Sequence, residues 1–185
     1  MNGWIEPGTG LTIFKGEQRV PLEIERKFLL PEFPAAQVRE GKLRIVKEQL
    51  IEQTYLALYE DQELRVRKIT DAASGDVEYT HTFKRGFGIA REEVEVSIAG
   101  GLYDQMIQAH GAVPLIKKRS TALWDGLQVE IDEYDQIQLM VLEVEFGSEE
   151  EAESFVPPAW FGQDISTDKE YSNKKVWREL QSRRS

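Results

Sequence analysis

The heptapeptide Leu22-Glu-Ile-Glu-Arg-Lys-Phe28 is the clearest pointer to the architecture of this chain. Successive side chains of a β-strand point to opposite faces, so Glu23, Glu25 and Lys27 would share one face. Ile24 and Phe28 would lie on the opposite face. Two carboxylates beside an ammonium can hold a divalent metal ion and an anion together. The heptapeptide therefore predicts a strand with one charged and one apolar face.

The same spacing recurs along the chain, usually with an apolar residue between two charges of the same sign. The recurring pairs are Arg65 and Arg67, Glu93 and Glu95, Lys117 and Arg119, Glu130 and Asp132, and Glu143 and Glu145. With turn residues between the segments, this pattern is typical of an antiparallel sheet or barrel. We expect strands at 21–30, 49–59, 62–69, 77–85, 91–98, 114–123, 127–134 and 138–146.

Helices are expected between and after these strands. Gly111 would end a helix over residues 102–110, and Ser148 with Glu151 has the spacing of a capping box. A helical stripe lies near 176–180, whereas 37–47 fits a short helix or an irregular segment. We expect the helices to pack on the outward apolar rows of the strands, which include Leu22, Phe28, Val94, Val96, Leu142 and Val144.

Composition limits the class of protein. The 185 residues are 41% hydrophobic and 30% charged, which suits one globular domain at 21–185 after an N-terminal extension at 1–20. The formal net charge of -10 argues against general nucleic-acid binding. Cysteine is absent and there are two histidines, which excludes thiolate and histidine-rich metal sites. Without an apolar run long enough to span a membrane or a visible signal peptide, we expect a cytoplasmic protein.

The charged faces allow two interpretations. A solvated outer sheet face is usually charged, and for any single strand this is the simpler explanation. Charges are nevertheless sorted by sign within each strand, and like charges close together repel. If the sheet closes into a barrel, these faces line a lumen, where unpaired charges cost several kcal/mol each. Divalent ions would neutralise the carboxylates, and a phosphate chain would bind the Lys and Arg side chains. An all-oxygen ligand set favours Mg²⁺ or Mn²⁺.

These motifs, in this order, resemble those of the CYTH superfamily, also called triphosphate tunnel metalloenzymes. The resemblance rests on Glu-Ile-Glu-Arg-Lys-Phe at 23–28, Glu-Leu-Arg-Val-Arg at 63–67, Phe-Lys at 83–84 and the acidic and basic pairs that follow. It implies an α+β fold built on an eight-stranded antiparallel β-barrel, open as a tunnel, that binds triphosphates with Mg²⁺ or Mn²⁺. The tail around 155–173 is similar to that of small bacterial members that hydrolyse inorganic tripolyphosphate.

The resemblance also implies roles for individual residues. The metal ligands would be Glu23, Glu25, Glu143 and Glu145. A second metal or a water molecule would be held by Glu130 and Asp132. The phosphate-binding residues would be Lys27, Arg65, Arg67, Lys84, Lys117, Arg119 and Lys169.

The proton acceptor for hydrolysis is a separate question. Alternation along 53–58 places Tyr55 on the lumen side if Leu56 and Leu58 face outward. A tyrosine has a reference pKa of about 10, and a neighbouring ammonium, for which Lys84 is the candidate, would lower it. Tyr55 would otherwise only pack and donate one hydrogen bond, and the rival route uses Glu130 or Asp132 to orient a metal-bound water.

The alternatives to a tripolyphosphatase are a thiamine or nucleoside triphosphatase, a class IV adenylate cyclase, and a non-catalytic polyphosphate-binding module. In each case the ligand is a small polyphosphate or organic triphosphate, and we expect no nucleic-acid or membrane partner. The sequence does not determine the oligomeric state, and a homodimer is compatible with it.

Overall fold

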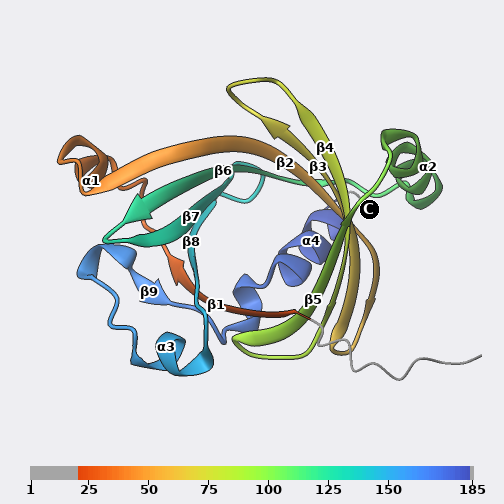
Figure 1. Cartoon of the computed structure of the whole chain (residues 1–185). Coiled ribbons are helices and arrows are strands. Elements are labelled where there is room, and N and C mark those ends of the chain that lie inside the picture. Colours follow the sequence, from red (N-terminus) through yellow and green to blue (C-terminus); the bar gives the residue numbers. More distant parts are fainter. Residues whose placement is uncertain (1–20, 184–185) are drawn as a thin grey trace, which may run out of the picture.

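A computed structural model describes residues 21–183, which form a closed antiparallel β-barrel of eight strands with one short extra strand (Figure 1). The sheet order is β5-β4-β3-β2-β6-β7-β8-β1-β9, and pairing of β5 with β1 closes the barrel. The eight barrel strands are Leu22–Leu29 (β1), Leu43–Tyr59 (β2), Gln62–Asp71 (β3), Val77–Arg85 (β4), Ala90–Ser97 (β5), Leu115–Trp124 (β6), Leu127–Tyr134 (β7) and Leu139–Glu145 (β8).

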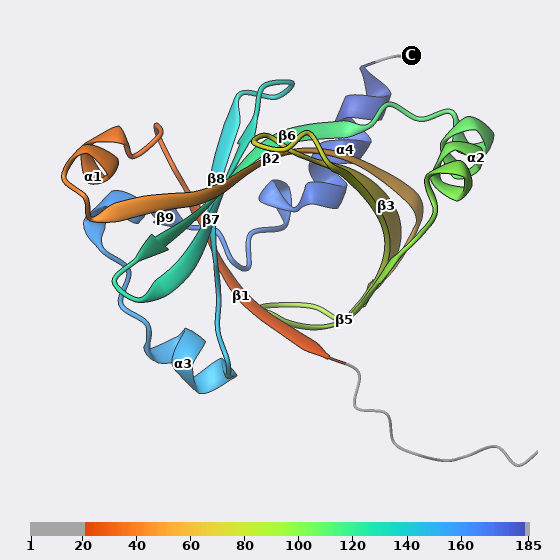
Figure 2. The ribbon, with the colours of Figure 1, turned by 45° about the horizontal axis from the view of Figure 1, so that its top comes forward.

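The expected α+β fold with an eight-stranded antiparallel barrel is confirmed. Closure is short: Leu22 to Ile24 of β1 pair with Ala90 to Glu92 of β5, as Figure 2 shows where the two strands meet. The remainder of β1 pairs with β8, and its end also pairs with β9 (Gln163–Asp164). The division into an extension at 1–20 and a domain at 21–185 stays a prediction, since 1–20 lie outside the described residues.

One expected boundary was wrong. Residues 43–47 belong to β2, and only α1 (Ala35–Arg39) is helical in the ambiguous segment. Gly41, two residues after the helix ends at Arg39, adopts φ +70°, a left-handed conformation that glycine tolerates and that turns the chain away from the helix. The long β2 strand pairs with both β3 and β6, and its register shifts between Ile45 and Lys47 and again between Tyr55 and Ala57. These irregularities let one strand bend around the barrel.

The short helices and the tail cover part of the outer wall. Phe28, Leu142 and Val144 are fully buried in one cluster with Phe161 of the 3₁₀ turn η1 (Ala159–Phe161). On α3 (Glu149–Ser154), the hydroxyl of the N-cap Ser148 accepts a hydrogen bond from the backbone N–H of Glu151, as the capping-box spacing predicted. The outward face where β5 meets the start of β1 is different, because Leu22, Val94 and Val96 remain 50%, 40% and 48% exposed. The expectation that helices cover all outward rows was therefore wrong for this part of the wall.

Helix α4 (Asn173–Ser182) does not pack on the outside of the barrel. It lies within the ring of strands (Figure 1), whereas α2 (Gly100–His110) lies outside it. Its Val176 and Trp177 are buried in a cluster with Tyr55 and Leu115, and the rings of Tyr55 and Trp177 meet edge-on at 5.5 Å. Apolar side chains on the inner faces of several strands thus receive the helix, which fills one end of the lumen. In residues 21–183 no helix combines the length and the apolar character that crossing a bilayer requires.

Candidate active site

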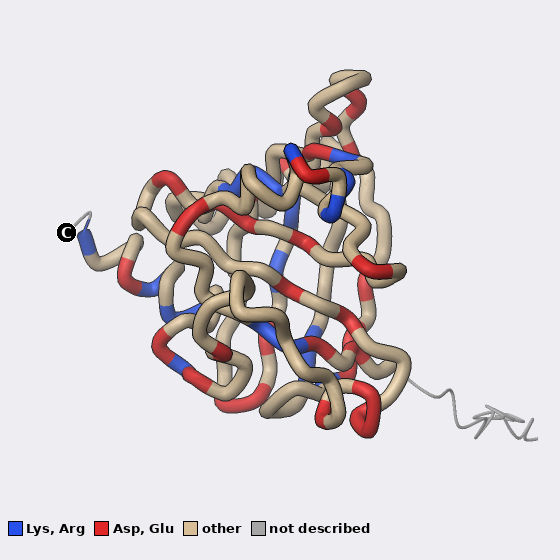
Figure 3. The backbone as a smooth tube through the Cα atoms, turned by 90° about the vertical axis from the view of Figure 1, so that its left-hand side faces the viewer, with Lys and Arg blue, Asp and Glu red and all other residues tan. Residues whose placement is uncertain are grey.

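The barrel lumen contains a cavity of about 1270 Å³ whose wall is highly charged. Figure 3 shows acidic and basic positions on neighbouring strands of the barrel. The structure brings all but one of the predicted site residues to this wall: Glu23, Glu25, Lys27, Tyr55, Arg65, Arg67, Lys84, Lys117, Arg119, Glu130, Glu143, Glu145 and Lys169. The exception is Asp132, which lies behind the wall with a side chain that is 0% exposed.

An acidic group forms where β1, β5 and β8 meet. Glu25 of β1 lies directly opposite Glu145 of β8, and Glu23 and Glu93 are close enough to act on Glu145 electrostatically. Burial raises the pKa of Glu145, and the negative charges of Glu23, Glu25 and Glu93 raise it further. Among residues 21–183, no Lys or Arg forms an ion pair with Glu145. This corner of the lumen therefore has an excess of negative charge.

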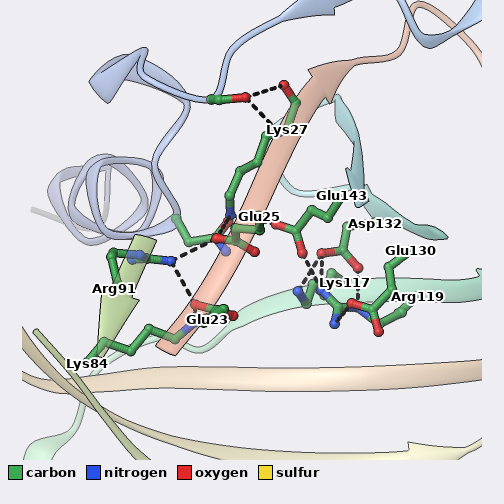
Figure 4. Close-up of polar contacts among 12 residues, drawn as sticks. Glu23, Glu25, Lys27, Lys84, Arg91, Lys117, Arg119, Glu130, Asp132 and Glu143 are labelled. Carbon is green, nitrogen blue, oxygen red and sulfur yellow. Dashed lines mark hydrogen bonds and ion pairs between the residues drawn. The ribbon is translucent and has the colours of Figure 1, made fainter. Parts of the chain in front are cut away.

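Arg91 and Lys84 each hold two of the other carboxylates of this corner (Figure 4). Nη2 of Arg91 lies 2.8 Å from Oε1 of Glu25 and 3.3 Å from Oε2 of Glu23. Nζ of Lys84 forms ion pairs with Glu23 and with Glu93, the latter at 2.7 Å. Because the side chain of Lys84 is 4% exposed, these carboxylates supply the charge that its burial requires.

A second ion-pair network lies on β6, β7 and β8. The carboxylate of Asp132 accepts a hydrogen bond from Nζ of Lys117 at 2.5 Å and two from Arg119, both at 2.6 Å. Burial would raise the pKa of Asp132, but Arg119 and Lys117 lower it more. Arg119 also pairs with Glu130 and Glu143. With its oxygens engaged by three cationic N–H donors, Asp132 orients Lys117 and Arg119 toward the lumen.

Lys27 connects the two networks. Its Nζ lies 2.6 Å from Oε1 of Glu143 and 3.1 Å from Oε1 of Glu25. Burial acts to lower the pKa of Lys27, but Glu143 and Glu25 raise it more, so the side chain stays charged. The backbone N–H of Lys27 donates to Oγ of Ser166 in the tail segment, which fixes β1 against that segment. One ammonium thus holds the acidic corner and the basic network in a fixed relation.

Arg65 and Arg67 extend the basic wall on β3. The side chain of Arg65 is 4% exposed, and its Nε and Nη2 have no hydrogen-bond partner among the described residues. Its nearest acid is Glu93, at 3.5 Å. Arg67 donates from Nε to Oε1 of Gln53 at 3.2 Å and lies 3.4 Å from Glu95. Buried guanidinium donors without an acceptor are rare, and Arg65 also lines the cavity, so its positive charge favours an anion there.

Tyr55 lies on the lumen side, as alternation predicted, although the local geometry differs from the expectation. The register shift after Tyr55 places Leu58 opposite Glu63 and against the apolar cluster of Tyr55 and Trp177, so Leu58 does not face outward. Burial, followed by the charge of Glu63, raises the pKa of Tyr55, whereas a lowering by Lys84 was expected. Arg65, Lys27 and Arg91 are the cations that oppose this rise.

Lys169 lies at the mouth of the cavity, on the 3₁₀ turn η2 (Lys169–Tyr171). Its Nζ is 5.9 Å from the ring centre of Phe87 in the loop between β4 and β5, and Phe87 is 65% exposed. The mouth therefore presents a cation and an aromatic ring to the entrance of the lumen.

Sequence reasoning missed several lumen residues, chiefly Arg91 and Glu63. Both have the same parity as predicted site residues, because Arg91 stands two before Glu93 and Glu63 two before Arg65. Extending each charged row by one position would have found them. Lys174 and Asn173 of α4 were also missed; Lys174 lies 3.7 Å from Glu63, and Asn173 accepts a hydrogen bond from the hydroxyl of Tyr134 at 2.7 Å. No alternation signal marks these two, since they reach the lumen on a helix.

The carboxylates of the acidic corner fit a hard divalent ion by their donor chemistry. Glu145 carries the uncompensated charge that such an ion would neutralise. Within residues 21–183, however, no three acidic or histidine side chains are already arranged around one metal position. Glu23, Glu25 and Glu143 are instead held by Lys and Arg, so a metal ion would have to take the place of a resident cation.

Comparisons with known proteins agree with this fold. Residues 21–175 match the family model described as the CYTH domain. A relative from Nitrosomonas europaea named inorganic triphosphatase is 37% identical over 158 residues, which cover 83% of this chain and 95% of the relative. A relative of the same name from Acetivibrio thermocellus is 27% identical over 157 residues, covering 83% and 92%. The crystal structure of the inorganic triphosphatase NE1496 shares 34% identity with a TM-score of 0.54, covering 83% of this chain and 93% of that one.

Proposed function

The chain belongs to the CYTH domain family, and on that premise we propose that it is a metal-dependent triphosphatase that hydrolyses inorganic tripolyphosphate to pyrophosphate and phosphate. The observation that carries this proposal is that one lumen contains both negative and positive charges that are poorly neutralised. Among residues 21–183, Glu145 faces three other carboxylates without an ion pair, while the buried Arg65 has its nearest acid, Glu93, at 3.5 Å. A phosphate chain accompanied by a divalent cation satisfies both groups.

The charge balance of the wall supports the same conclusion. Acidic and basic side chains line the cavity in equal number, so a polyanion entering alone would leave the lumen strongly negative. A polyphosphate that arrives with divalent cations avoids this penalty. Mg²⁺ or Mn²⁺ held by Glu23, Glu25, Glu143 and Glu145 would neutralise charge on the phosphate oxygens.

The chain's own residues would align the substrate. Arg65, Arg67 and Arg119 offer planar forks that bind two phosphate oxygens at once, whereas lysines act as point charges. We assign Lys27, Lys84, Lys117 and Lys169 to this second type of contact. Asp132 is the anchor that keeps Lys117 and Arg119 in place. Water then attacks the terminal phosphorus, the bridging P–O bond breaks, and pyrophosphate leaves.

The proton of the attacking water needs an acceptor, and we assign it to Tyr55. The cations that favour its ionised form are Arg65, Lys27 and Arg91, because Lys84 is paired with Glu23 and Glu93. A raised pKa of Tyr55 predicts that hydrolysis accelerates as the pH rises into the alkaline range. The rival acceptor is Glu130, whose pKa is raised by burial and by Glu143, although a carboxyl group has a much lower reference pKa than a phenol. The two assignments therefore differ in the pH–rate profile.

The experiment that tests the function is phosphate release from tripolyphosphate, ATP and thiamine triphosphate, with Mg²⁺ and with Mn²⁺. We expect tripolyphosphate to be the preferred substrate. Glu25→Gln should remove most of the metal-dependent rate and leave the fold intact, because Glu25 supplies an oxygen ligand. Preference for an organic triphosphate would assign the site to one of the other family activities. Tight binding of all three without turnover would identify a binding module. A cytoplasmic location and the absence of nucleic-acid and membrane partners stay predictions.

A further inference from the structure

We propose that Arg91 is the resident cation of the metal site. It holds Glu23 and Glu25 until a divalent ion replaces it, and its guanidinium then turns to the polyphosphate. The inference rests on the proposed function, because it takes these two carboxylates as metal ligands. Its consequence is that metal binding and phosphate binding are coupled through one side chain.

The position of Arg91 is the first argument. A single nitrogen, Nη2, lies 2.8 Å from an oxygen of Glu25 and 3.3 Å from an oxygen of Glu23 (Figure 4). A guanidinium nitrogen and a divalent ion cannot occupy the space between the same two carboxylates. Arginine also remains protonated at any physiological pH, so it cannot lose its charge to make room. Metal binding therefore requires the side chain of Arg91 to move.

The second argument is that Arg91 differs from the other cations on these carboxylates. When Glu23 coordinates a metal ion, Lys84 keeps its ion pair with Glu93 at 2.7 Å. Lys27 has its closest carboxylate oxygen on Glu143, at 2.6 Å, and lies farther from Glu25, at 3.1 Å. Arg91 loses both close partners at once. It is consequently the cation that a metal ion releases.

Once released, the side chain of Arg91 has another carboxylate within reach. Nη1 of Arg91 lies 3.9 Å from Oε1 of Glu63, which is on the cavity wall and 5% exposed at its side chain. Lys174 of α4 shares this carboxylate, at 3.7 Å. Glu63 can therefore retain Arg91 inside the lumen but cannot satisfy all of its N–H donors. The remaining donors match the oxygens of a phosphate group.

The test measures the affinity for Mn²⁺ without any phosphate, by electron paramagnetic resonance of the free ion. Arg91→Gln should tighten Mn²⁺ binding about tenfold, the scale of one charge-assisted hydrogen bond. Pyrophosphate titrated calorimetrically into the Mn²⁺-loaded variant should bind about tenfold more weakly than to the wild type. The two affinities thus move in opposite directions, which general damage to the lumen would not produce.

Arg85→Gln is the matched control. Arg85 lies on the neighbouring strand, is 53% exposed at its side chain and pairs with Glu92 at 2.6 Å, and its substitution removes the same charge. We expect both affinities of this variant to stay within about twofold of the wild type, because the pair is exposed and screened.

The outcomes distinguish a failure of the role of Arg91 from a failure of the proposed function. Unchanged or weaker Mn²⁺ binding by Arg91→Gln overturns the inference, as does a parallel loss of both affinities. If that variant does not fold, Arg91→Lys replaces it; one ammonium cannot span both carboxylates and Glu63, so Mn²⁺ binding should still tighten, though by less. Wild-type protein that binds Mn²⁺ neither alone nor together with pyrophosphate removes the proposed function itself. Wild-type binding that Arg91→Gln leaves unaltered removes only the role of Arg91.

Discussion

Replacing Asp132 with asparagine should destabilise the barrel strongly, since this carboxylate is the only ion-pair partner of Lys117 among the described residues. The side chains of Asp132 and Lys117 are 0% and 3% exposed, so Asp132→Asn leaves an ammonium buried without a counter-charge. Breaking one side of a buried pair typically costs about 3 to 5 kcal/mol. Arg119 keeps Glu130 and Glu143, which places the expected cost toward the lower end of that range. For a chain of this size, the corresponding fall in Tm is roughly 6 to 20 °C.

Thermal and urea unfolding of Asp132→Asn would measure this cost, with Glu133→Gln as the control. Glu133 pairs with Lys118 at 3.4 Å on the surface, where both side chains are well exposed, so its loss should cost about 0 to 1 kcal/mol. The pH dependence adds a second check. Burial already lowers the pKa of Lys117, and removing Asp132 lowers it further. The unfolded variant then binds more protons than the folded one, so the free energy of unfolding of the variant rises with pH. The difference in this free energy between the variant and the wild type therefore narrows as the pH rises.

Two results would refute this reasoning. An Asp132→Asn variant as stable as Glu133→Gln would show that Asp132 does not neutralise Lys117. A stability difference between the variant and the wild type that widens as the pH rises would show that Lys117 is not the destabilised group. A variant that keeps its stability but loses turnover would return Asp132 to a catalytic role, alongside Glu130.

Three further predictions follow from the lumen. Tyr55→Phe should abolish the rise of the tripolyphosphatase rate at alkaline pH, because the raised pKa of Tyr55 sets that rise; an unchanged pH–rate profile would assign the proton to Glu130. Arg65→Lys should raise KM about tenfold in steady-state kinetics, since an ammonium cannot replace two parallel guanidinium bonds; an unaltered KM would place the phosphate elsewhere. Mn²⁺ affinity should increase with pH through the acid range, because the ion competes with a proton on Glu145, whose pKa is raised. Titration of Glu145→Gln should show weaker and less pH-dependent binding, and a profile matching the wild type would contradict the role of Glu145.

The strand pattern was predictable because alternation is a local property. Glu23, Glu25 and Lys27 share a face in any strand, and the structure gives them that face. The end of the lumen was harder to foresee. Leu115 has the same parity as Lys117, so an apolar inner residue was visible in the sequence, but nothing local shows that α4 enters the barrel to cover it. The irregular register after Tyr55 likewise depends on how β2 bends between two partners.

The pairing of charges across strands could not be derived from the sequence, because it depends on the register. Sorting by sign along each strand suggested that every charged group needs a ligand. In the barrel, most groups instead meet an opposite charge on the neighbouring strand, as Glu23 meets Arg91. The same register pairs Lys84 with Glu93 and Arg119 with Asp132.

Two cross-strand pairs join like charges, and they narrow the place where a metal ion is needed. Glu130 lies opposite Glu143, but Arg119 forms ion pairs with both and resolves the repulsion. Glu25 lies opposite Glu145, and there only Glu25 is held by cations. Like charges directly opposite in a sheet are destabilising. The barrel therefore leaves one unresolved repulsion at the junction of β1 and β8, which is where a divalent ion gains the most from binding and where Arg91 stands in its way.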